Sequence, residues 1–283
     1  MVFYTHKELS KSIEDQRSNV ESIGFVPTMG ALHDGHIALM KQALNDNQLL
    51  VVSIFVNPTQ FNNTEDLAKY PRLLDQDLAI IKANLPDHNI ILYAPTVADV
   101  YGKHTVSKTY NFAGLESVME GAQRPGHFDG VGTILEFLFK VVQPDRAYFG
   151  EKDFQQLQII KRLVHQLELP IDIIGCPIHR EQSGLAMSSR NGRLTKENFQ
   201  KASFIYETLF EARKYFETHS ISESVDLVEN KMKANADFEL EYFTIADEDT
   251  LIPATSKEAG KKYRAFIVVH LQGVRLIDNI PLY

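Results

Sequence analysis

The sequence predicts an α/β protein with a parallel sheet in its larger first part and a smaller α+β second part. Up to about residue 180, short apolar runs alternate with segments of helical period, which is typical of a parallel sheet with crossover helices. After that point two helical segments precede a group of strands, as in α+β domains. The composition, 44% apolar and 23% charged over 283 residues, is that of a globular chain with one or two domains. We predict domains at residues 1–177 and 178–283.

The first part is expected to begin with a strand at 22–27 and a helix at 36–45, where apolar residues recur at helical spacing. Residues 49–56 are almost continuously apolar and rich in β-formers, which favours a strand buried on both faces. The other elements expected here are a helix at 66–85, a strand at 89–93, a helix at 131–142, a strand at 146–149, a helix at 153–169 and a strand at 171–177.

The second part opens with residues 183–193, which are rich in Ser, Gly and Arg and predict a loop. Two amphipathic segments and three strand-like segments follow it. The predicted helices are 197–218 and 222–234, and the predicted strands are 238–245, 264–271 and 273–278.

Charge and cysteine content restrict the class of protein. A formal net charge of −8 argues against general nucleic-acid binding, which needs a basic face. The single cysteine, Cys176, permits no intrachain disulfide or cysteine-rich metal site and fits a reducing compartment. The first residues lack the apolar core of a signal peptide, and the longest apolar stretch is too short to span a bilayer. We therefore expect a cytoplasmic protein without a nucleic-acid or membrane partner.

The first segment with chemical content is V-P-T-M-G-A-L-H-D-G-H at 26–36, between a predicted strand and a predicted helix. Loops after parallel strands bind ligands, and a helix N-terminus favours an anion. Gly30 and Gly35 allow a close backbone approach, and His33 and His36 share one helix face. No lysine follows the second glycine, so a P-loop is excluded. Two surface histidines or a metal pair remain open for the two imidazoles taken alone.

Two further segments carry neutral and basic groups. Asn57 and Gln60 follow the buried strand and suit a hydroxyl or carboxylate, although an ordinary Asn-Pro turn explains them equally well. Arg124 and His127 lie in a glycine-rich loop before an apolar helix and could bind an anion, or simply form a capped loop.

The last two segments suit phosphates. Gly150 leads from a strand into a helix, with Lys152 and Asp153 at the helix start and Gln156 one turn in. The segment 187–190, M-S-S-R, places two hydroxyls beside a guanidinium, which suits a polyphosphate, although a polar linker has the same composition. The segments together predict a nucleotide site that the second domain closes.

The strings P-T-M-G-A-L-H-D-G-H, F-V-N-P, Y-P-R, R-P-G-H-F-D-G-V, F-G-E-K-D-F-Q-Q and M-S-S-R-N occur in this order. Together they resemble the pantothenate synthetase (pantoate–β-alanine ligase) family, from the first strand to L-I-D-N at 276–279. H-D-G-H resembles the H-x-G-H signature of nucleotidyltransferases with a Rossmann-like sheet. Residues 187–190 resemble the mobile K-M-S-K-S loop of class I aminoacyl-tRNA synthetases.

The resemblance implies a two-step ligation by a homodimer, in which ATP, Mg²⁺ and (R)-pantoate give pantoyl adenylate and β-alanine then gives pantothenate and AMP. It implies catalytic roles for His36, His33 and Lys152. It assigns ATP to Met29, Gly30, His33, Gly35, His36, Gly150, Lys152, Asp153, the backbone at His179, Met187, Ser188, Ser189 and Arg190. Pantoate and β-alanine are assigned to Gln60 and Gln156, with Asn57, Arg124 and His127 in the same pocket.

Three positions depart from the pattern of the family. Thr59 stands where many members have Met, which predicts a more polar acyl pocket. Gln76-Asp77 replaces a pair of acids found in some members, so Asp77 is expected at most to help hold Mg²⁺. His179 stands where an apolar residue is frequent, and its side chain is of little consequence if the backbone contacts adenine.

Three rival functions remain. The nearest is a nucleotidyltransferase with a different small acceptor, and neutral Gln60 and Gln156 disfavour a phosphorylated one. A nucleotide sensor is expected to lack one of His36, Lys152 and Arg190, and all three are present. A metal-binding H-x-x-H protein is the third.

Overall fold

The computed structural model describes residues 1–86 and 88–283. The chain divides into two compact units. One comprises Met1–Glu151 and Gln155–Pro177, and the other comprises Lys152–Phe154 and Ile178–Tyr283.

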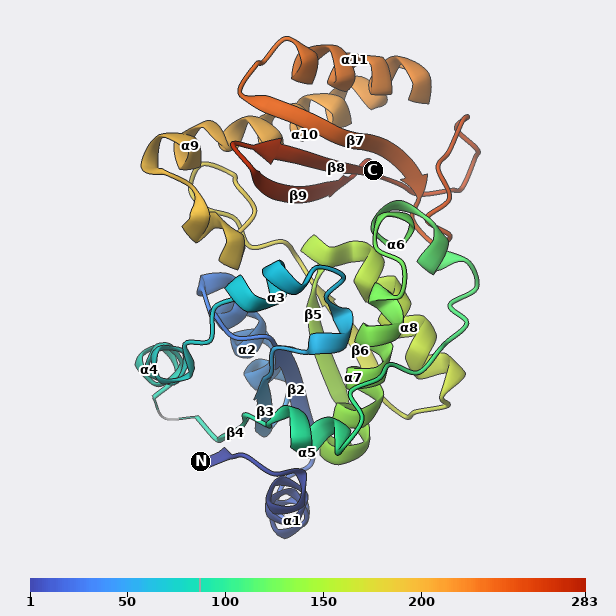
Figure 1. The fold of residues 1–283 in the computed structure, drawn as a ribbon. Helices are drawn as coiled ribbons and strands as arrows, with labels where there is room; N and C mark the ends of the chain where they lie inside the picture. The colour runs from blue at the N-terminus through green and yellow to red at the C-terminus, as the bar shows by residue number, and fades with distance from the viewer. Residues whose placement is uncertain (87) are drawn as a thin grey trace. The chain divides into compact units, whose positions relative to one another are not determined.

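The first unit is built on a six-stranded parallel sheet of order β1-β4-β3-β2-β5-β6 (Figure 1). Its strands are β1 (Val2–Phe3), β2 (Ile23–Thr28), β3 (Leu49–Ile54), β4 (Ile90–Tyr93), β5 (Arg146–Gly150) and β6 (Asp172–Cys176). The order reverses at β2 and β5, because the chain adds β3 and β4 on one side of β2 and β5 and β6 on the other. Open α/β sheets bind ligands at such a reversal, outside the carboxyl ends of the strands. The predicted α/β class with a Rossmann-like parallel sheet is confirmed.

The helices of this sheet cover both of its faces. They are α1 (His6–Arg17), α2 (Asp34–Asp46), α3 (Thr64–Lys69), α4 (Leu74–Asn84), α5 (Val97–Tyr101), α6 (Met119–Gln123), α7 (His127–Val142) and α8 (Phe154–Gln166), with short 3-10 turns η1 (Pro58–Gln60), η2 (Leu115–Ser117) and η3 (Glu151–Asp153). Met40 of α2 and Ile81 of α4 join Val26 of β2 in one core. On the opposite face, Phe25 meets Phe139 of α7 edge to face, with centroids 6.2 Å apart.

Besides β1, α5 and α6, which were not predicted, two regions differ from the predicted elements. The expected helix at 66–85 is two helices, α3 and α4, because Pro71 has no N–H and disfavours helical torsions at Tyr70, which is extended at ψ 127°. The helix α1 was not predicted, although Thr5 is its N-cap: Thr5 Oγ1 accepts the Glu8 N–H and donates to the Glu8 carboxylate.

The second unit contains an antiparallel sheet of β7 (Phe238–Asp247), β8 (Tyr263–Leu271) and β9 (Val274–Pro281). Its helices are α9 (Lys196–Lys201), α10 (Ser203–Phe216) and α11 (Ile221–Lys233), with a 3-10 turn η4 (Ser189–Arg193). Figure 1 shows α10 and α11 on one face of this sheet, where Leu209 and Val228 pack in one core with Ile267. The predicted helix 197–218 divides at Ala202, which keeps helical torsions and is buried, so the apolar pattern runs on through the break.

Within residues 1–86 and 88–283, no helix combines the length and apolarity needed to cross a membrane.

Candidate active site

The loop from β2 to α2 is held in an unusual backbone conformation. Gly30 has φ +81° and Ala31 has φ +51°, so two successive residues are left-handed. The Asp77 carboxylate accepts the N–H groups of Ala31 (3.1 Å) and Leu32 (2.7 Å) from across the fold. A Cβ on Gly30 would lie 2.8 Å from Asp77 Oδ2. Position 30 therefore requires glycine both for its φ and for the space that Asp77 occupies.

Asp77 is buried, with 1% of its surface exposed, and it acts here as a support for the loop. Burial raises the pKa of Asp77, and the hydrogen bonds from Leu32 and Ala31 oppose that rise. Both carboxylate oxygens are engaged by these N–H groups, so the contacts lend no support to the expectation that Asp77 helps hold Mg²⁺.

His33 and His36 begin α2 as a capping box made of imidazoles. His33 is the N-cap and its Nδ1 accepts the Gly35 N–H at 3.2 Å, while His36 Nδ1 accepts the His33 N–H at 3.3 Å. A ring nitrogen that accepts carries no proton, so the neutral rings are protonated at Nε2. Each ring thus has an Nε2–H donor in addition to its capping bond.

The turn η1 orients the amide of Gln60. Gln60 Oε1 accepts from Asn57 Nδ2 at 3.1 Å, and Gln60 Nε2 lies 2.9 Å from Met29 Sδ. Asn57 Nδ2 also donates to the Gly130 carbonyl at 3.1 Å. A Cβ on Gly130 would lie 2.4 Å from the Thr59 carbonyl oxygen, so the glycine permits α7 to pack directly on this turn. The structure thereby brings Met29, Asn57 and Gln60 together.

Arg124 and His127 reach the same turn from the other side. His127 Nδ1 donates to the Gln60 carbonyl at 2.7 Å, and Arg124 Nη2 donates to it at 3.2 Å. Arg124 Nη1 lies 3.2 Å from His127 Nε2, which is therefore the acceptor. These contacts give both side chains a supporting task behind Gln60, which the sequence did not predict.

Tyr101 of α5 contacts the turn η1, and nothing in the sequence around Tyr101 predicts that contact. Its hydroxyl donates to Asn57 Oδ1 at 2.5 Å and lies 2.8 Å from Thr59 Oγ1. Burial raises the pKa of Tyr101, while the hydrogen bonds of Thr59 and Asn57 oppose that rise. Thr59 Oγ1 also donates to Asn57 Oδ1 at 3.1 Å, so the Thr that departs from the family pattern adds a polar contact here.

Two neighbouring glutamines at the start of α8 have different environments. Gln155 is buried and donates to the carbonyls of Leu115 (2.7 Å) and Val118 (2.8 Å), and it accepts the Glu120 N–H at 3.0 Å. Gln156 is only partly buried. Gly150, which ends β5, has open space where a Cβ would point. Gln155 is thus structural, and Gln156 keeps surface for a ligand.

In the second unit, Lys152 follows the carboxyl end of β5. Its side chain is 16% exposed, and Nζ lies 3.7 Å from Asp153 Oδ1. That separation makes a weak ion pair, so the ammonium keeps most of its capacity for another anion.

The segment 178–193 forms a narrow loop that ends in η4. The His179 carbonyl accepts the Met187 N–H at 3.0 Å, and Arg180 pairs with Ala186 as an antiparallel bridge. The His179 side chain is exposed. Ser188 is the N-cap of η4, with Oγ accepting the Arg190 N–H at 3.2 Å.

One pocket of the second unit contains several predicted phosphate ligands. Lys152, Ser188 and Arg190 line it together with Asp278 and Arg275. Ser189 is the first residue of η4, beside this pocket in the chain. The structure therefore brings Lys152 to the M-S-S-R segment within one unit.

The described residues contain no group of three or more His, Cys, Asp or Glu side chains that could hold a metal ion. Among residues 1–86 and 88–283, His33 and His36 therefore meet no further ligands of the kind that a zinc site requires.

Comparison with known proteins agrees with this geometry. The family model described as pantoate-beta-alanine ligase matches residues 1–281. A pantothenate synthetase of Christiangramia forsetii is 52% identical over 281 residues, which is 99% of each chain. One from Flavobacterium psychrophilum is 55% identical over 274 residues, covering 97% of this chain and 95% of the relative.

Solved structures agree as well. Pantothenate synthetase from Thermus thermophilus superposes with a TM-score of 0.90 at 39% identity, covering 100% of this chain and 99% of the other. The ligase from Francisella tularensis, complexed with beta-gamma ATP and beta-alanine, gives a TM-score of 0.81 at 34% identity, covering 100% and 97%. The chain belongs to the pantoate–β-alanine ligase family.

Proposed function

We propose that this chain joins (R)-pantoate to β-alanine at the expense of ATP, in two steps. In the first step a pantoate carboxylate oxygen attacks the α-phosphorus of ATP, the bond to the β-phosphate oxygen breaks, and pyrophosphate leaves. In the second step the amine of β-alanine attacks the acyl carbon, the bond to the AMP oxygen breaks, and the amine loses a proton. The relatives that carry this name match over almost the full length of the chain, which supports the assignment.

The observation that carries the proposal is the imidazole capping box at the start of α2. Two Nδ1 atoms accept backbone N–H groups, so the neutral rings of His33 and His36 carry their protons on Nε2, at a helix N-terminus that itself favours an anion. Attack at phosphorus needs positioning and neutralisation of charge more than covalent help from the protein. We assign to His36 the donor that stabilises the transition state, with His33 beside it on the phosphates. Met29, Gly30 and Gly35 are assigned to the same nucleotide.

The second unit is proposed to supply the cationic side of phosphate binding. Lys152 neutralises the charge that develops on the transferred phosphate, and Ser188, Ser189 and Arg190 bind the outer phosphates. The pocket that Lys152, Ser188 and Arg190 line together supports this assignment. Gly150, Asp153, Met187 and the backbone at His179 are proposed to border the nucleotide.

The acyl substrate is assigned to the amides. Gln60 is fixed by Asn57 and Met29, and amides can bind both a hydroxyl and a carboxylate. We propose that Gln60 and Gln156 bind pantoate and that Gln60 also contacts β-alanine. Arg124 and His127 contribute by holding the Gln60 backbone.

Mg²⁺ is proposed to enter as part of the nucleotide substrate. Magnesium keeps several waters and is commonly bound through phosphate oxygens, so it needs no cage of protein ligands. The lack of a three-ligand cluster in the described parts of the chain is compatible with that mode.

Exchange of labelled pyrophosphate into ATP tests the first step directly. With Mg²⁺ present and β-alanine absent, exchange is expected only when (R)-pantoate is added, and AMP is expected only after β-alanine is added. Exchange that does not depend on pantoate, in folded protein that binds ATP, would instead indicate another acceptor.

We further propose that residues 1–177 bind ATP and pantoate, that residues 178–283 act as a lid, and that the enzyme is a cytoplasmic homodimer. The family resemblance supports the dimer, and the single cysteine fits a reducing compartment. Sedimentation equilibrium tests the dimer, and proteolysis of the 178–193 loop with and without ATP tests the lid.

A further inference from the structure

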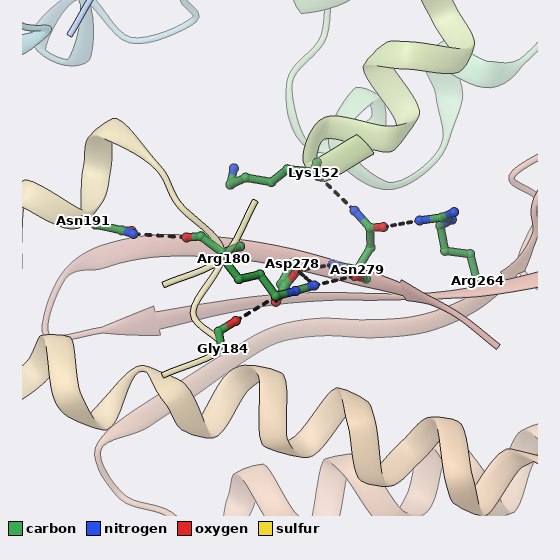
Figure 2. A network of polar contacts seen from close by, with 8 residues as sticks. Lys152, Arg180, Gly184, Asn191, Arg264, Asp278 and Asn279 are labelled. Atoms are coloured by element: carbon green, nitrogen blue, oxygen red, sulfur yellow. Dashed lines mark hydrogen bonds and ion pairs between the residues drawn. The ribbon is translucent and has the colours of Figure 1, made fainter. Parts of the chain in front are cut away.

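Asp278 and Asn279 of β9 are adjacent polar residues that are both almost fully buried, with 4% and 1% of their surfaces exposed. Buried polar groups of this kind are costly unless every donor and acceptor is paired. Here the pairing runs to Lys152 on one side and to the 178–193 loop on the other (Figure 2). Neither residue belongs to the set of ligands assigned above.

The amide of Asn279 has a single possible orientation. Arg264 Nη1 donates to Asn279 Oδ1 at 2.7 Å, and a guanidinium can only donate. Asn279 Nδ2 must then point to the opposite side, where it donates to the Lys152 carbonyl at 2.9 Å. In Figure 2 the Lys152 carbonyl faces Asn279, while the Lys152 side chain runs away from the network.

Arg264 is itself firmly placed. Its Nε and Nη2 donate to Glu248 Oε1 at 2.9 and 2.6 Å, and its guanidinium lies 3.9 Å from the centroid of the Phe154 ring. Phe154 is two residues beyond Lys152 in the chain. Two contacts thus fix the short segment 152–154: Asn279 binds the Lys152 carbonyl, and the Arg264 guanidinium packs on the Phe154 ring.

Asp278 anchors the other phosphate-binding segment to the same strand. Arg180 donates to both of its carboxylate oxygens, at 2.6 and 3.0 Å, and also to the Gly184 carbonyl at 3.0 Å. The loop that Arg180 fixes leads directly into Ser188 and Arg190. Two adjacent residues of β9 therefore determine the spacing between the Lys152 backbone and this loop.

From these contacts we propose that Asn279 is a positioning residue for Lys152: by holding the Lys152 carbonyl, it directs the ammonium into the pocket that Ser188 and Arg190 also line. Replacing a buried ionic or polar network with apolar packing is often neutral or stabilising for a protein. We therefore infer that this network serves to position Lys152 rather than to add stability. The inference rests on the proposed role of Lys152 in the first step.

The test is a double-mutant cycle on pantoate-dependent pyrophosphate exchange. Asn279→Asp keeps the oxygen that accepts from Arg264 and replaces only the donor to the Lys152 carbonyl. We expect kcat to fall by about tenfold to a hundredfold while the KM for ATP changes by less than about threefold. The reason is that a misplaced Lys152 ammonium weakens charge stabilisation mainly in the transition state. In a Lys152→Ala background the same substitution is expected to change kcat by less than about twofold.

Asn198→Asp is the matched control. Asn198 lies in the same unit, is 3% exposed, and donates through Nδ2 to Gln272 Oε1 at 2.6 Å, so the substitution removes an equally buried amide donor that does not reach Lys152. It is expected to leave kcat within about twofold of the unsubstituted chain. If Asn279→Asp does not fold, Asn279→Ala enters the same cycle, because it places no carboxylate beside the carbonyl.

The outcomes separate the two proposals. If Lys152→Ala alone leaves exchange unchanged, the role proposed for Lys152 is wrong. If Lys152→Ala lowers exchange but the Asn279 substitution costs as much in that background as in the original, Asn279 acts independently of Lys152. An equal loss of kcat in Asn198→Asp also overturns the inference, since the effect would then follow from a buried carboxylate anywhere in this unit.

Discussion

The imidazole rings of His33 and His36 lie with their centroids 4.1 Å apart and their planes at 44°. Both rings use Nδ1 to accept a backbone N–H of the first turn of α2, and we propose that Nε2 of the same rings contacts the nucleotide. A residue at either position therefore has two separable tasks, one at each nitrogen. Substitutions that keep one nitrogen and remove the other can distinguish capping from catalysis.

His36→Asn is expected to slow adenylation strongly with little effect on folding. The asparagine Oδ1 takes the place of Nδ1 as acceptor for the His33 N–H, but nothing replaces the Nε2–H donor. Loss of one donor to a developing oxyanion costs about 10²–10³ in kcat, so pyrophosphate exchange should fall by that factor. Thermal unfolding checks that the cap is retained. His36→Ala is the paired variant and should lose both the activity and about 1 kcal/mol of stability.

Asp77→Asn is expected to disable the β2–α2 loop, because an amide can accept only one of the two N–H groups of Ala31 and Leu32 and turns its own donor toward the other. An unsatisfied buried group costs about 1–3 kcal/mol. We expect exchange activity to fall by at least about tenfold, and raising the Mg²⁺ concentration should not restore it. Asp75→Asn, at an exposed position of the same helix, is the control. Full recovery in excess Mg²⁺ would instead make Asp77 a metal ligand.

The Asp77 contact also shows where prediction from sequence ends. The buried strand β3 was predictable because a central strand, covered on both faces, has a continuous apolar run. The loop that carries the glycines and histidines at 30–36 was predictable because an apolar run precedes it and a segment of helical period follows it. The hydrogen bonds of Asp77, by contrast, reach 45 and 46 residues along the chain, and no local pattern encodes them.

Tyr101 illustrates the same limit. Its hydroxyl contacts Asn57 and Thr59, more than forty residues away, from a short helix with no glycine-rich loop before it. The split of the predicted helix 66–85 had a local cause, since Pro71 lies within it. The elements follow from local periodicity and breakers, whereas the support of the site follows from contacts that only the folded chain creates.

We expect opposite phenotypes when Gln155 and its neighbour Gln156 are each replaced by Ala. Gln156→Ala is expected to raise the KM for pantoate by about tenfold to a hundredfold, since a lost hydrogen bond to a charged group costs about 1.5–3 kcal/mol, and to leave stability unchanged. Gln155→Ala removes three hydrogen bonds of a side chain that is 4% exposed, so it should lower the free energy of unfolding by about 2–4 kcal/mol. Steady-state kinetics and denaturant unfolding on the same two variants give the comparison. An unchanged pantoate dependence in Gln156→Ala removes that residue from the pocket.

Glu136 of α7 should make the stability of the first unit depend on acid pH. Burial raises the pKa of this carboxyl, but hydrogen bonds from Lys108, Lys140 and Tyr110 outweigh burial and lower the pKa from 4.5 to about 2. Because the pKa in the folded state is lower than in the unfolded chain, the stabilisation is complete above about pH 4.5 and is lost as the pH falls toward 2.

The shift corresponds to about 3 kcal/mol at neutral pH. Glu136→Gln keeps the shape of the side chain but cannot titrate. At pH 7 this variant should therefore have a lower free energy of unfolding than the unsubstituted chain. At pH 2.5 the free energies of unfolding of the two proteins should be nearly equal. Denaturant unfolding of the two proteins across this range measures the difference directly. A difference that stays constant from pH 7 to pH 2.5 would show that the lysines and Tyr110 bind Glu136 without favouring its ionised form.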